Sequence, residues 1–285
     1  GIAEQDMIGT AAGLAMAGLI PFATTFAVFA ANRANEQIRM AVCYNEANVK
    51  IAVSHGGLIA GEDGATHQGL EDIAAMRLMP GMTVIVPADA PETRLATIAA
   101  AEMEGPVYLR LTRLAFPYVT EGIREPFEIG KARTLRSGGE VSIIACGIMV
   151  GMAMEASESL QREGISASVV NMHTIKPIDR DAVIAEAKRT GCVVTAEEHS
   201  IYGGRSGGGG AGGALSGSGG TRGHPGYLRR IRRSPRPAEK IRLDAGSDRR
   251  RGPRGDPQKE KPGVAGALKR AKQKSPVSRR NRGFF

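Results

Sequence analysis

The residues best suited to chemistry lie in one glycine-rich loop, HGGLIAGEDGATHQ, at positions 55–68. The loop follows the apolar run VKIAVSH and precedes a segment with helical periodicity. In open α/β sheets, ligands bind at this position, past the carboxyl end of a strand. Two imidazoles and two carboxylates there could relay protons or hold a polar substrate. An ordinary crossover loop with solvated acids is the alternative, and the spacing of His55 and His67 matches no helical zinc motif.

Other chemically suited residues are spread along the first 113 positions. Glu4, in GIAEQDM, falls in the first turn of a predicted helix, where a carboxylate also complements the helix dipole. Phe26 and Phe29, in TTFAVFAANR, are three residues apart and can face the same side, although core packing would explain them too. Arg113 ends the β-rich run LRLTR, where an isolated arginine would be a solvated charge.

The elements that must position these residues alternate between β-rich runs and helical periodicity, which is typical of parallel sheets covered by helices. Further helices are predicted over 29–44, 69–79, 91–103, 152–163 and 181–190. The last of them has a carboxylate at its start and a glycine just past its end. The predicted strands are PFATTF, VKIAVSH, MTVIVPAD, PVYLRLTR, VSIIACGIMV, ISASVVNM and CVVTAEEHS.

The domain organisation is predicted from changes in composition along the 285 residues. Periodicity lapses in FPYVTEGIREPFEIGK, so we predict one domain over 1–120 and a second over 121–204. These two parts hold 16 Lys and Arg against 24 Asp and Glu, whereas 205–285 holds 22 against 5. The net charge of +9 therefore belongs to the last part, whose Gly, Arg and Pro content predicts a disordered tail.

The cellular setting is predicted from the cysteines and the apolar runs. Cys43, Cys146 and Cys192 lie in apolar surroundings without paired spacing, which favours a reducing, cytoplasmic compartment. The longest apolar stretch is interrupted by Gly18 and Pro21, which argues against a membrane span. Because no strand precedes the first helix and the first residue is not Met, we expect the first elements of the first domain to be missing.

Several blocks together resemble the C-terminal half of a transketolase, especially the separate C-terminal subunit of two-chain bacterial and archaeal forms. They are GIAEQDM, FAVFAANR, HGGLIAGEDGATHQGLEDIAAMRLMPGMTVIVPAD, GPVYLRLTR, NMHTIKPID and VVTAEEHS. The resemblance runs through residue 204. It implies two open, mainly parallel α/β domains, one that binds the pyrimidine of thiamine diphosphate and one of the transketolase C-terminal type. The implied activity is transfer of a two-carbon ketol unit from a ketose phosphate to an aldose phosphate, in pentose phosphate metabolism.

The resemblance also implies roles for the residues that match its motifs. Glu4 takes the position of the glutamate that bonds the aminopyrimidine N1′ of the cofactor, and we expect burial to raise the pKa of Glu4 and keep it protonated. Phe26 and Phe29 match the aromatic wall that stacks on the pyrimidine. His55 and His67 match histidines of the substrate channel, with catalytic and substrate-binding roles.

Two further residues match substrate-binding positions, and one motif position departs from the family. Asp63 matches an acid that hydrogen-bonds a substrate hydroxyl, and Arg113 matches an arginine for the sugar phosphate. Many relatives carry an aromatic residue one turn beyond Phe29, where this chain has Asn32 and Asn35.

Part of the implied active site must come from another polypeptide or another half. The family's motif for Mg²⁺ and diphosphate, an acidic Gly-Asp-Gly run followed by Asn, does not occur in the sequence. The resemblance therefore implies an N-terminal subunit or half that supplies the metal site, assembled as a dimer of such pairs, and an inactive chain in isolation. The second domain has no implied part in the chemistry, and His173 and His199 are interpreted as structural.

Two alternative functions remain open. A 1-deoxyxylulose-5-phosphate synthase shares GIAEQ, although QDM and GEDGATHQGLED are nearer to transketolase. The second alternative is a non-catalytic relative whose basic tail binds nucleic acid through phosphate contacts.

The tail has a further explanation, a shift of reading frame. Codons chosen for Glu239 to Arg250 and read one nucleotide out of frame give Arg-Lys-Tyr-Gly-Leu-Thr-Pro-Glu-Ala-Ile-Val, which contains a phrase with which transketolases end. GC-rich codons read out of frame yield Arg, Gly and Pro, the residues that dominate the tail. We therefore predict a frameshift after Gly204.

Overall fold

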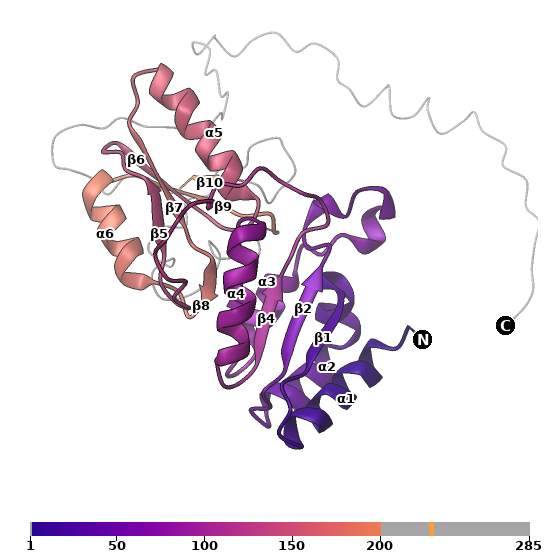
Figure 1. Cartoon of the computed structure of the whole chain (residues 1–285). Coiled ribbons are helices and arrows are strands. Elements are labelled where there is room, and N and C mark those ends of the chain that lie inside the picture. Colours follow the sequence, from indigo (N-terminus) through magenta and orange to yellow (C-terminus); the bar gives the residue numbers. More distant parts are fainter. Residues whose placement is uncertain (1, 201–227, 231–285) are drawn as a thin grey trace, which may run out of the picture. The chain divides into compact units, whose positions relative to one another are not determined.

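The computed structural model describes residues 2–200 and the backbone of residues 228–230. These residues belong to one compact unit and form two five-stranded sheets flanked by helices (Figure 1). The predicted fold of open, mainly parallel α/β sheets is confirmed, with antiparallel strands at the sheet edges. Within the described part, no helix combines the length and apolar character needed to cross a membrane.

The first sheet has the strand order β1-β2-β4-β3-β8. The first four of these strands run parallel, so their carboxyl ends lie at one edge. Strands β3 and β4 are buried along their whole length, as expected for parallel strands covered on both faces. The five strands are β1 (Phe22–Phe26), β2 (Lys50–Ser54), β3 (Thr83–Ile85), β4 (Val107–Arg110) and β8 (Thr174–Lys176).

The helices of the first half follow the predicted positions. The segment predicted as one helix over 29–44 is helical, but it contains two π-helical stretches, η1 and η2, on either side of a short α-helix. Such stretches are frequent at functional sites. The elements are α1 (Glu4–Met16), η1 (Phe29–Arg33), α2 (Asn35–Gln37), η2 (Ile38–Cys43), α3 (Asp72–Leu78) and α4 (Ala90–Glu102).

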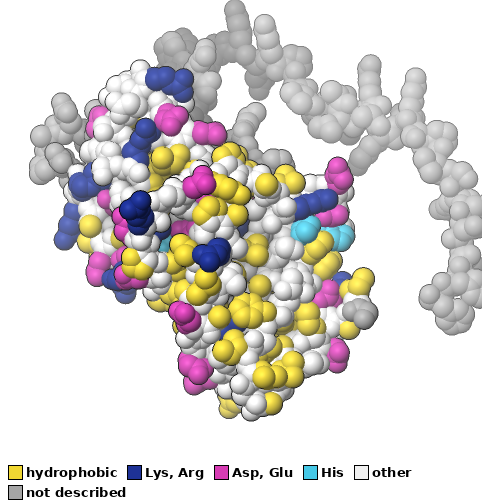
Figure 2. All heavy atoms as spheres, viewed as in Figure 1, with side chains coloured by type: hydrophobic (Ala, Val, Ile, Leu, Met, Phe, Trp, Pro, Cys, Tyr) yellow, Lys and Arg dark blue, Asp and Glu magenta, His cyan; other side chains and the backbone are white. Residues whose placement is uncertain are grey.

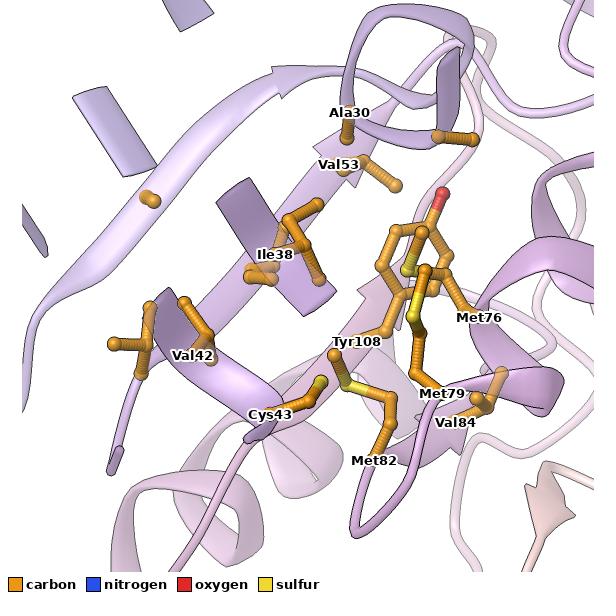
Figure 3. Close-up of a cluster of buried hydrophobic side chains, with 14 of the residues drawn as sticks. Ala30, Ile38, Val42, Cys43, Val53, Met76, Met79, Met82, Val84 and Tyr108 are labelled. Atoms are coloured by element: carbon orange, nitrogen blue, oxygen red, sulfur yellow. The ribbon is translucent and has the colours of Figure 1, made fainter. Parts of the chain in front are cut away.

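The main hydrophobic core packs η2 and α3 against one face of the first sheet. Figure 3 shows Met76, Met79 and Met82 gathered around the ring of Tyr108. Methionine side chains adapt to irregular gaps, which suits a junction between π-helical and α-helical segments. The hydroxyl of Tyr108 donates to Asp72 Oδ2 over 2.9 Å, which satisfies its polar atom inside the core. The opposite face of the sheet is covered by α4.

The second sheet has the order β10-β9-β6-β7-β5. Strands β9, β6 and β7 run parallel, and β5 pairs antiparallel with β7. The sequence did not predict β5 or β8, which are short edge strands. The five strands are β5 (Arg133–Arg136), β6 (Val141–Ala145), β7 (Ala167–Asn171), β9 (Val193–Ala196) and β10 (Leu228–Arg230).

Two helices cover the second sheet, α5 (Met149–Arg162) and α6 (Arg180–Thr190). The termini of α6 confirm the prediction for this helix. Asp179 caps its start by accepting a hydrogen bond from the Ala182 amide, and Gly191 ends it in the left-handed conformation with φ 65°.

Of the predicted tail over 205–285, the structure describes the backbone of three residues. The backbone of Leu228–Arg230 pairs antiparallel with β9. The edge of β9 carries backbone N–H and C=O groups that such a segment can pair with. The rest of the predicted tail, and with it the predicted frameshift, lies outside the described residues.

The first 120 residues and the following segment share contacts within this unit. Strand β8 follows β7 in the chain but pairs with β3 of the first sheet. Asn171 donates to both carboxylate oxygens of Glu92. Backbone pairing and buried polar groups thus join the two sheets.

Candidate active site

The candidate site lies at the carboxyl edge of the first sheet. Strands β1 and β2 end at Phe26 and Ser54, and β4 ends at Arg110. Because these strands are parallel, the segments that follow them meet at the same edge. The sheet therefore brings together residues from TTFAVFAANR, the glycine-rich loop and LRLTR.

The glycine-rich loop is closed at its base and ordered along its length. The Gly57 amide donates to the Gly69 carbonyl over 2.8 Å, so the two ends of the loop lie side by side. Between them the chain forms two short 3₁₀ segments, η3 (Leu58–Asp63), which is kinked at Gly61 with φ 65°, and η4 (Ala65–His67). The loop backbone thus has a defined conformation, which positions its histidines and acids.

Two phenylalanines and two histidines form one cluster of rings. The rings of Phe26 and Phe29 are nearly parallel, with centroids 5.8 Å apart and an interplanar angle of 7°. His55 stacks on Phe26 with a centroid distance of 3.7 Å. His67 meets Phe29 edge-on at 5.3 Å. The phenylalanines therefore face the loop, and Figure 2 shows histidine side chains at the surface beside basic and acidic ones.

His55 is held in an unusual backbone conformation, with φ 58°. Its Nδ1 lies 2.8 Å from the Ser54 hydroxyl, and its Nε2 lies 3.6 Å from Asp63 Oδ2. Burial disfavours the charged ring and lowers the pKa of His55, although Asp63 opposes this effect. The ring is therefore neutral at neutral pH and able to accept a proton.

Arg113 lies against the loop that carries Asp63. Its Nη1 contacts Asp63 Oδ2 at 3.1 Å and donates to the Ala60 carbonyl over 2.6 Å. About a third of each charged side chain remains exposed, at 32% and 33%. His67 has a partner of its own, the Thr66 hydroxyl, 2.9 Å from Nδ1. Asp63 thus lies between His55 and Arg113, and the side chains of Asp63 and Arg113 remain partly accessible to solvent.

Glu4 is buried in the first turn of α1, with 6% of its surface exposed. Its Oε2 accepts a hydrogen bond of 2.8 Å from Arg33 Nη1, and Thr25 donates a longer one of 3.4 Å to Oε1. The hydrogen bond from Arg33 is the largest cause that lowers the pKa of Glu4 below its usual value, and it outweighs burial. The sequence analysis expected burial to raise this pKa, and the arginine reverses the direction.

Arg33 is a residue of the site that the sequence analysis missed. Its guanidinium carbon lies 4.4 Å from the centroid of the Phe29 ring, a cation–π arrangement. One side chain thereby links Glu4 to the ring cluster. The available signal was its spacing of four residues from Phe29 within one helical block.

The two asparagines at the departing motif positions do not extend the aromatic wall. Asn32 Nδ2 donates to Glu71 Oε1 over 2.6 Å, and Asn35 Nδ2 donates to the Ala31 carbonyl over 2.7 Å. Both are engaged in local hydrogen bonds. The wall therefore consists of Phe26 and Phe29.

A buried ion pair lies under the loop. Arg110 Nε donates to Asp72 Oδ2 over 2.7 Å, and both side chains are almost fully buried, at 6% and 0% exposed. The Nη2 of Arg110 donates to the Gly69 carbonyl, which ties the end of the loop to β4. Asp72 Oδ1 lies 4.0 Å from His199 Nε2 and has no hydrogen-bond partner among the described residues. The Arg110–Asp72 pair was not predicted, since its two side chains come from different segments.

The two histidines of the second half are buried, which agrees with a structural interpretation. His199 Nε2 accepts from the Ala74 amide, and its Nδ1 lies 3.0 Å from the Ser200 carbonyl. His173 packs against the Phe127 ring at a centroid distance of 4.2 Å, and burial lowers its pKa to about 4.

The structure brings the proposed site residues into a continuous set of contacts. Glu4 reaches Phe29 through Arg33, and the rings continue to His55, Asp63 and Arg113. A second missed residue joins from the far part of the chain. The Ile59 amide of the loop donates to Glu198 Oε1 over 2.9 Å. Glu198 lies in the quoted block VVTAEEHS, where two consecutive acids after a strand were the available signal.

Comparison with protein families assigns each of the two parts of the chain to a known domain. Residues 1–118 match the model of the transketolase pyrimidine-binding domain, and residues 130–208 match that of the transketolase C-terminal domain. These domains imply dependence on thiamine diphosphate. The matches leave the residues from 209 to the end outside either model.

Similar proteins extend these matches. The 6-deoxy-6-sulfo-D-fructose transketolase subunit of Clostridium sp. (strain MSTE9) is 46% identical over 204 residues, which cover 72% of this chain and 63% of that subunit. A 1-deoxy-D-xylulose-5-phosphate synthase of Heliobacterium modesticaldum is 40% identical over 205 residues, 72% of this chain and 31% of the synthase.

A solved structure supports the same relationship. A split-gene transketolase, described as an inactive β4 tetramer, superimposes with a TM-score of 0.68 and 52% sequence identity, and the match covers 72% of this chain and 66% of that one. The two matched domains, in this order and with these relatives, place the chain in the transketolase family.

Proposed function

We propose that this chain is the C-terminal part of a thiamine-diphosphate-dependent transketolase, which moves a two-carbon ketol unit from a ketose phosphate to an aldose phosphate. The carrying observation is the contact series from Glu4 through Phe26, Phe29 and His55 to Asp63 at one sheet edge. Aromatic rings can stack on a cofactor ring, a carboxylate can bind a substrate hydroxyl, and an arginine can bind a phosphate.

The described residues fit the pyrimidine side of the cofactor. The rings of Phe26 and Phe29 are parallel within 7° and only partly buried, so they offer an apolar surface to an aromatic ring. Glu4 holds a carboxylate at the adjoining helix start, and its partner Arg33 is 46% exposed. When bound, thiamine diphosphate supplies the carbon nucleophile of ketol transfer, and these residues would orient it.

Glu4 would change its state when the pyrimidine binds. With Arg33 as its partner, the carboxyl is ionised at neutral pH. Displacement of the guanidinium by a neutral ring nitrogen would remove the largest cause of the lowered pKa and leave burial, which raises it. Glu4 could then hold a proton in a hydrogen bond to N1′ of the pyrimidine.

The loop residues would bind the sugar. His55, neutral and stacked on Phe26, can accept a proton from a substrate hydroxyl, and His67 lies across the same rings. Asp63 would accept a hydrogen bond from a hydroxyl. Arg113 offers a guanidinium, about a third exposed, to the sugar phosphate.

The diphosphate and Mg²⁺ would be bound by an N-terminal subunit or half, and the working assembly would be a dimer of such pairs. Support comes from the descriptions of two relatives, since the Clostridium protein is named a transketolase subunit and the solved structure is a split-gene transketolase described as an inactive β4 tetramer. We expect this chain alone to be inactive. The cytoplasmic location remains a prediction from the unpaired cysteines.

The test combines the chain with a matching N-terminal transketolase subunit, thiamine diphosphate and Mg²⁺. We expect ketol transfer from xylulose 5-phosphate to ribose 5-phosphate, and a drop in turnover of at least about 100-fold in Glu4→Ala. Glu36→Ala, an exposed acid of α2, serves as the control with turnover near wild type. Unchanged turnover in Glu4→Ala would remove its assigned role.

The same mixture distinguishes the second candidate function. The 40% identity to a 1-deoxy-D-xylulose-5-phosphate synthase keeps that activity open. Product formation from pyruvate and glyceraldehyde 3-phosphate, without ketol transfer, would assign the chain to the synthase. Binding of nucleic acid by the whole chain that weakens with salt, in the absence of either activity, would favour the non-catalytic alternative.

A further inference from the structure

A carboxylate from the second sheet lies directly under the glycine-rich loop. Glu198 follows β9 by two residues and is 3% exposed. Its Oε1 accepts the Ile59 amide over 2.9 Å, and a hydrogen bond with the Leu58 amide also favours its ionised form. The first turn of the loop is therefore bound to a side chain 139 positions further along the chain.

The loop backbone and this carboxylate are in contact, and only glycine fits between them. A Cβ on Gly57 would lie 2.2 Å from the carboxyl carbon of Glu198, and Gly57 has φ +86°, which also favours glycine. The close approach lets the carboxylate reach two consecutive amides. A larger residue at position 57 would displace the turn or the carboxylate of Glu198.

Arg110 completes the attachment. Its Nη2 donates to the Glu198 carbonyl over 3.0 Å and to the Gly69 carbonyl over 3.1 Å. Burial raises the pKa of Glu198, and the charge of Arg110 is the largest opposing cause. One guanidinium thus stabilises the carboxylate that holds the start of the loop and fixes the loop's end.

The consequence falls on the histidine at the start of the loop. His55 is two residues before Gly57 and adopts φ 58°, a conformation that non-glycine residues rarely adopt without support. The turn held by Glu198 begins two residues later, at Gly57. Asp63, which contacts His55 and Arg113, ends η3, which Ile59 helps to begin and which is kinked at Gly61 with φ 65°.

We propose that Glu198 is a positioning residue, whose carboxylate holds the Gly57–Ile59 turn and thereby fixes His55 and Asp63 at the candidate active site. Its catalytic consequence rests on the proposed ketol transfer, whereas its effect on the loop does not. The second sheet then takes part in catalysis through the loop, although none of its described residues belongs to the ring cluster.

The first experiment measures amide hydrogen exchange in the whole chain. In Glu198→Ala we expect exchange at Leu58 and Ile59 to accelerate by about tenfold, the factor for losing one hydrogen bond to a charged acceptor, with β2 unchanged. Glu186→Ala is the matched control, since it removes another buried carboxylate of the second half that bonds Ser142 instead of the loop. Equal acceleration in both variants, or none at the loop, would overturn the proposal.

A second experiment remains informative if Glu198→Ala does not fold. Gly57→Ala introduces a Cβ against the carboxylate, whereas Gly64→Ala, in the same loop with φ +76°, meets nothing within 4 Å. We expect a larger loss of loop protection in Gly57→Ala. In Glu198→Gln, which keeps one acceptor oxygen, we expect an acceleration smaller than tenfold. Equal effects of the two glycine variants, together with unchanged exchange in Glu198→Gln, would refute the proposal.

The activity measurement uses the assembled enzyme. Glu198→Ala should lower kcat and leave the KM for thiamine diphosphate near wild type, and Glu198→Gln should restore much of kcat. If the wild type shows no ketol transfer, the proposed function fails while hydrogen exchange still decides the role of Glu198. If the wild type is active and loop exchange is unchanged in Glu198→Ala, the positioning role fails alone.

Discussion

The stability of the folded chain should fall in mild acid because of one buried histidine. His173 is 2% exposed, packs on Phe127, and has a pKa lowered from 6.5 to about 4, first by burial and then by the charge of Arg133. Between pH 6.5 and pH 4, His173 binds a proton in the unfolded chain but stays neutral in the folded chain. The free energy of unfolding therefore decreases as the pH falls from 6.5 toward 4.

The magnitude follows from the difference of about 2.5 in pKa. At about 1.4 kcal/mol for each pKa unit, the full effect is about 3 kcal/mol, and about 2 kcal/mol of it is reached at pH 5. His173→Gln removes the titrating group. Its packing loss is the same at both pH values, so it cancels in the comparison.

The assay is urea unfolding followed by far-ultraviolet circular dichroism at pH 7.5 and pH 5.0. We expect the wild type to lose about 2 kcal/mol more than His173→Gln over this interval. Carboxyl groups that titrate in the same range are common to both proteins and cancel. His67→Gln, which removes a partly exposed histidine, controls for the loss of an imidazole. Parallel pH profiles for wild type and His173→Gln would refute the reasoning.

Further predictions concern the buried pair, the cofactor glutamate and the tail. Asp72→Ala should destabilise the chain by about 3–5 kcal/mol in urea unfolding, because it leaves the guanidinium of Arg110 buried without its carboxylate; a loss below about 1 kcal/mol would contradict this. Arg33→Met should raise the pKa of Glu4, followed by carbon NMR of its carboxyl group, and an unchanged value would show that Arg33 does not hold it. Fresh genomic and transcript sequence around Gly203–Ser206 should restore a frame that ends in Lys-Tyr-Gly-Leu-Thr, whereas the printed frame in both would establish the basic tail.

The sequence predicted the central strands well because they are buried on both faces and read as continuous apolar runs. All seven predicted strands are present as β1, β2, β3, β4, β6, β7 and β9, and six of them lie inside their sheets, whereas β1 is at an edge and partly exposed. The missed strands β5 and β8 have three or four residues and include Arg or Lys. An edge strand of this kind is formed by backbone pairing with a neighbour, which leaves little pattern in its own side chains.

The candidate site was predicted from motif positions, whereas its electrostatics could not be. The match of these sequence blocks to the family's motifs predicted that Glu4, the phenylalanines and the loop residues lie near one another. The direction of the Glu4 pKa depends on Arg33, 29 positions away. The conformation of the loop depends on Glu198, 139 positions from its partner amide. Such contacts arise from the fold and have no local signature.

Because of these contacts, we do not expect the two parts on either side of the predicted boundary near residue 121 to fold independently. Residues 1–120 alone would lack β8, so the outer edge of β3 would lose its pairing. They would also lack Glu198 under the loop and Asn171 beside the buried Glu92. We therefore expect a fragment of residues 1–120 to show faster hydrogen exchange in β3 and in the loop than the whole chain. Equal protection in the fragment would show that the first sheet forms its site without help from the second.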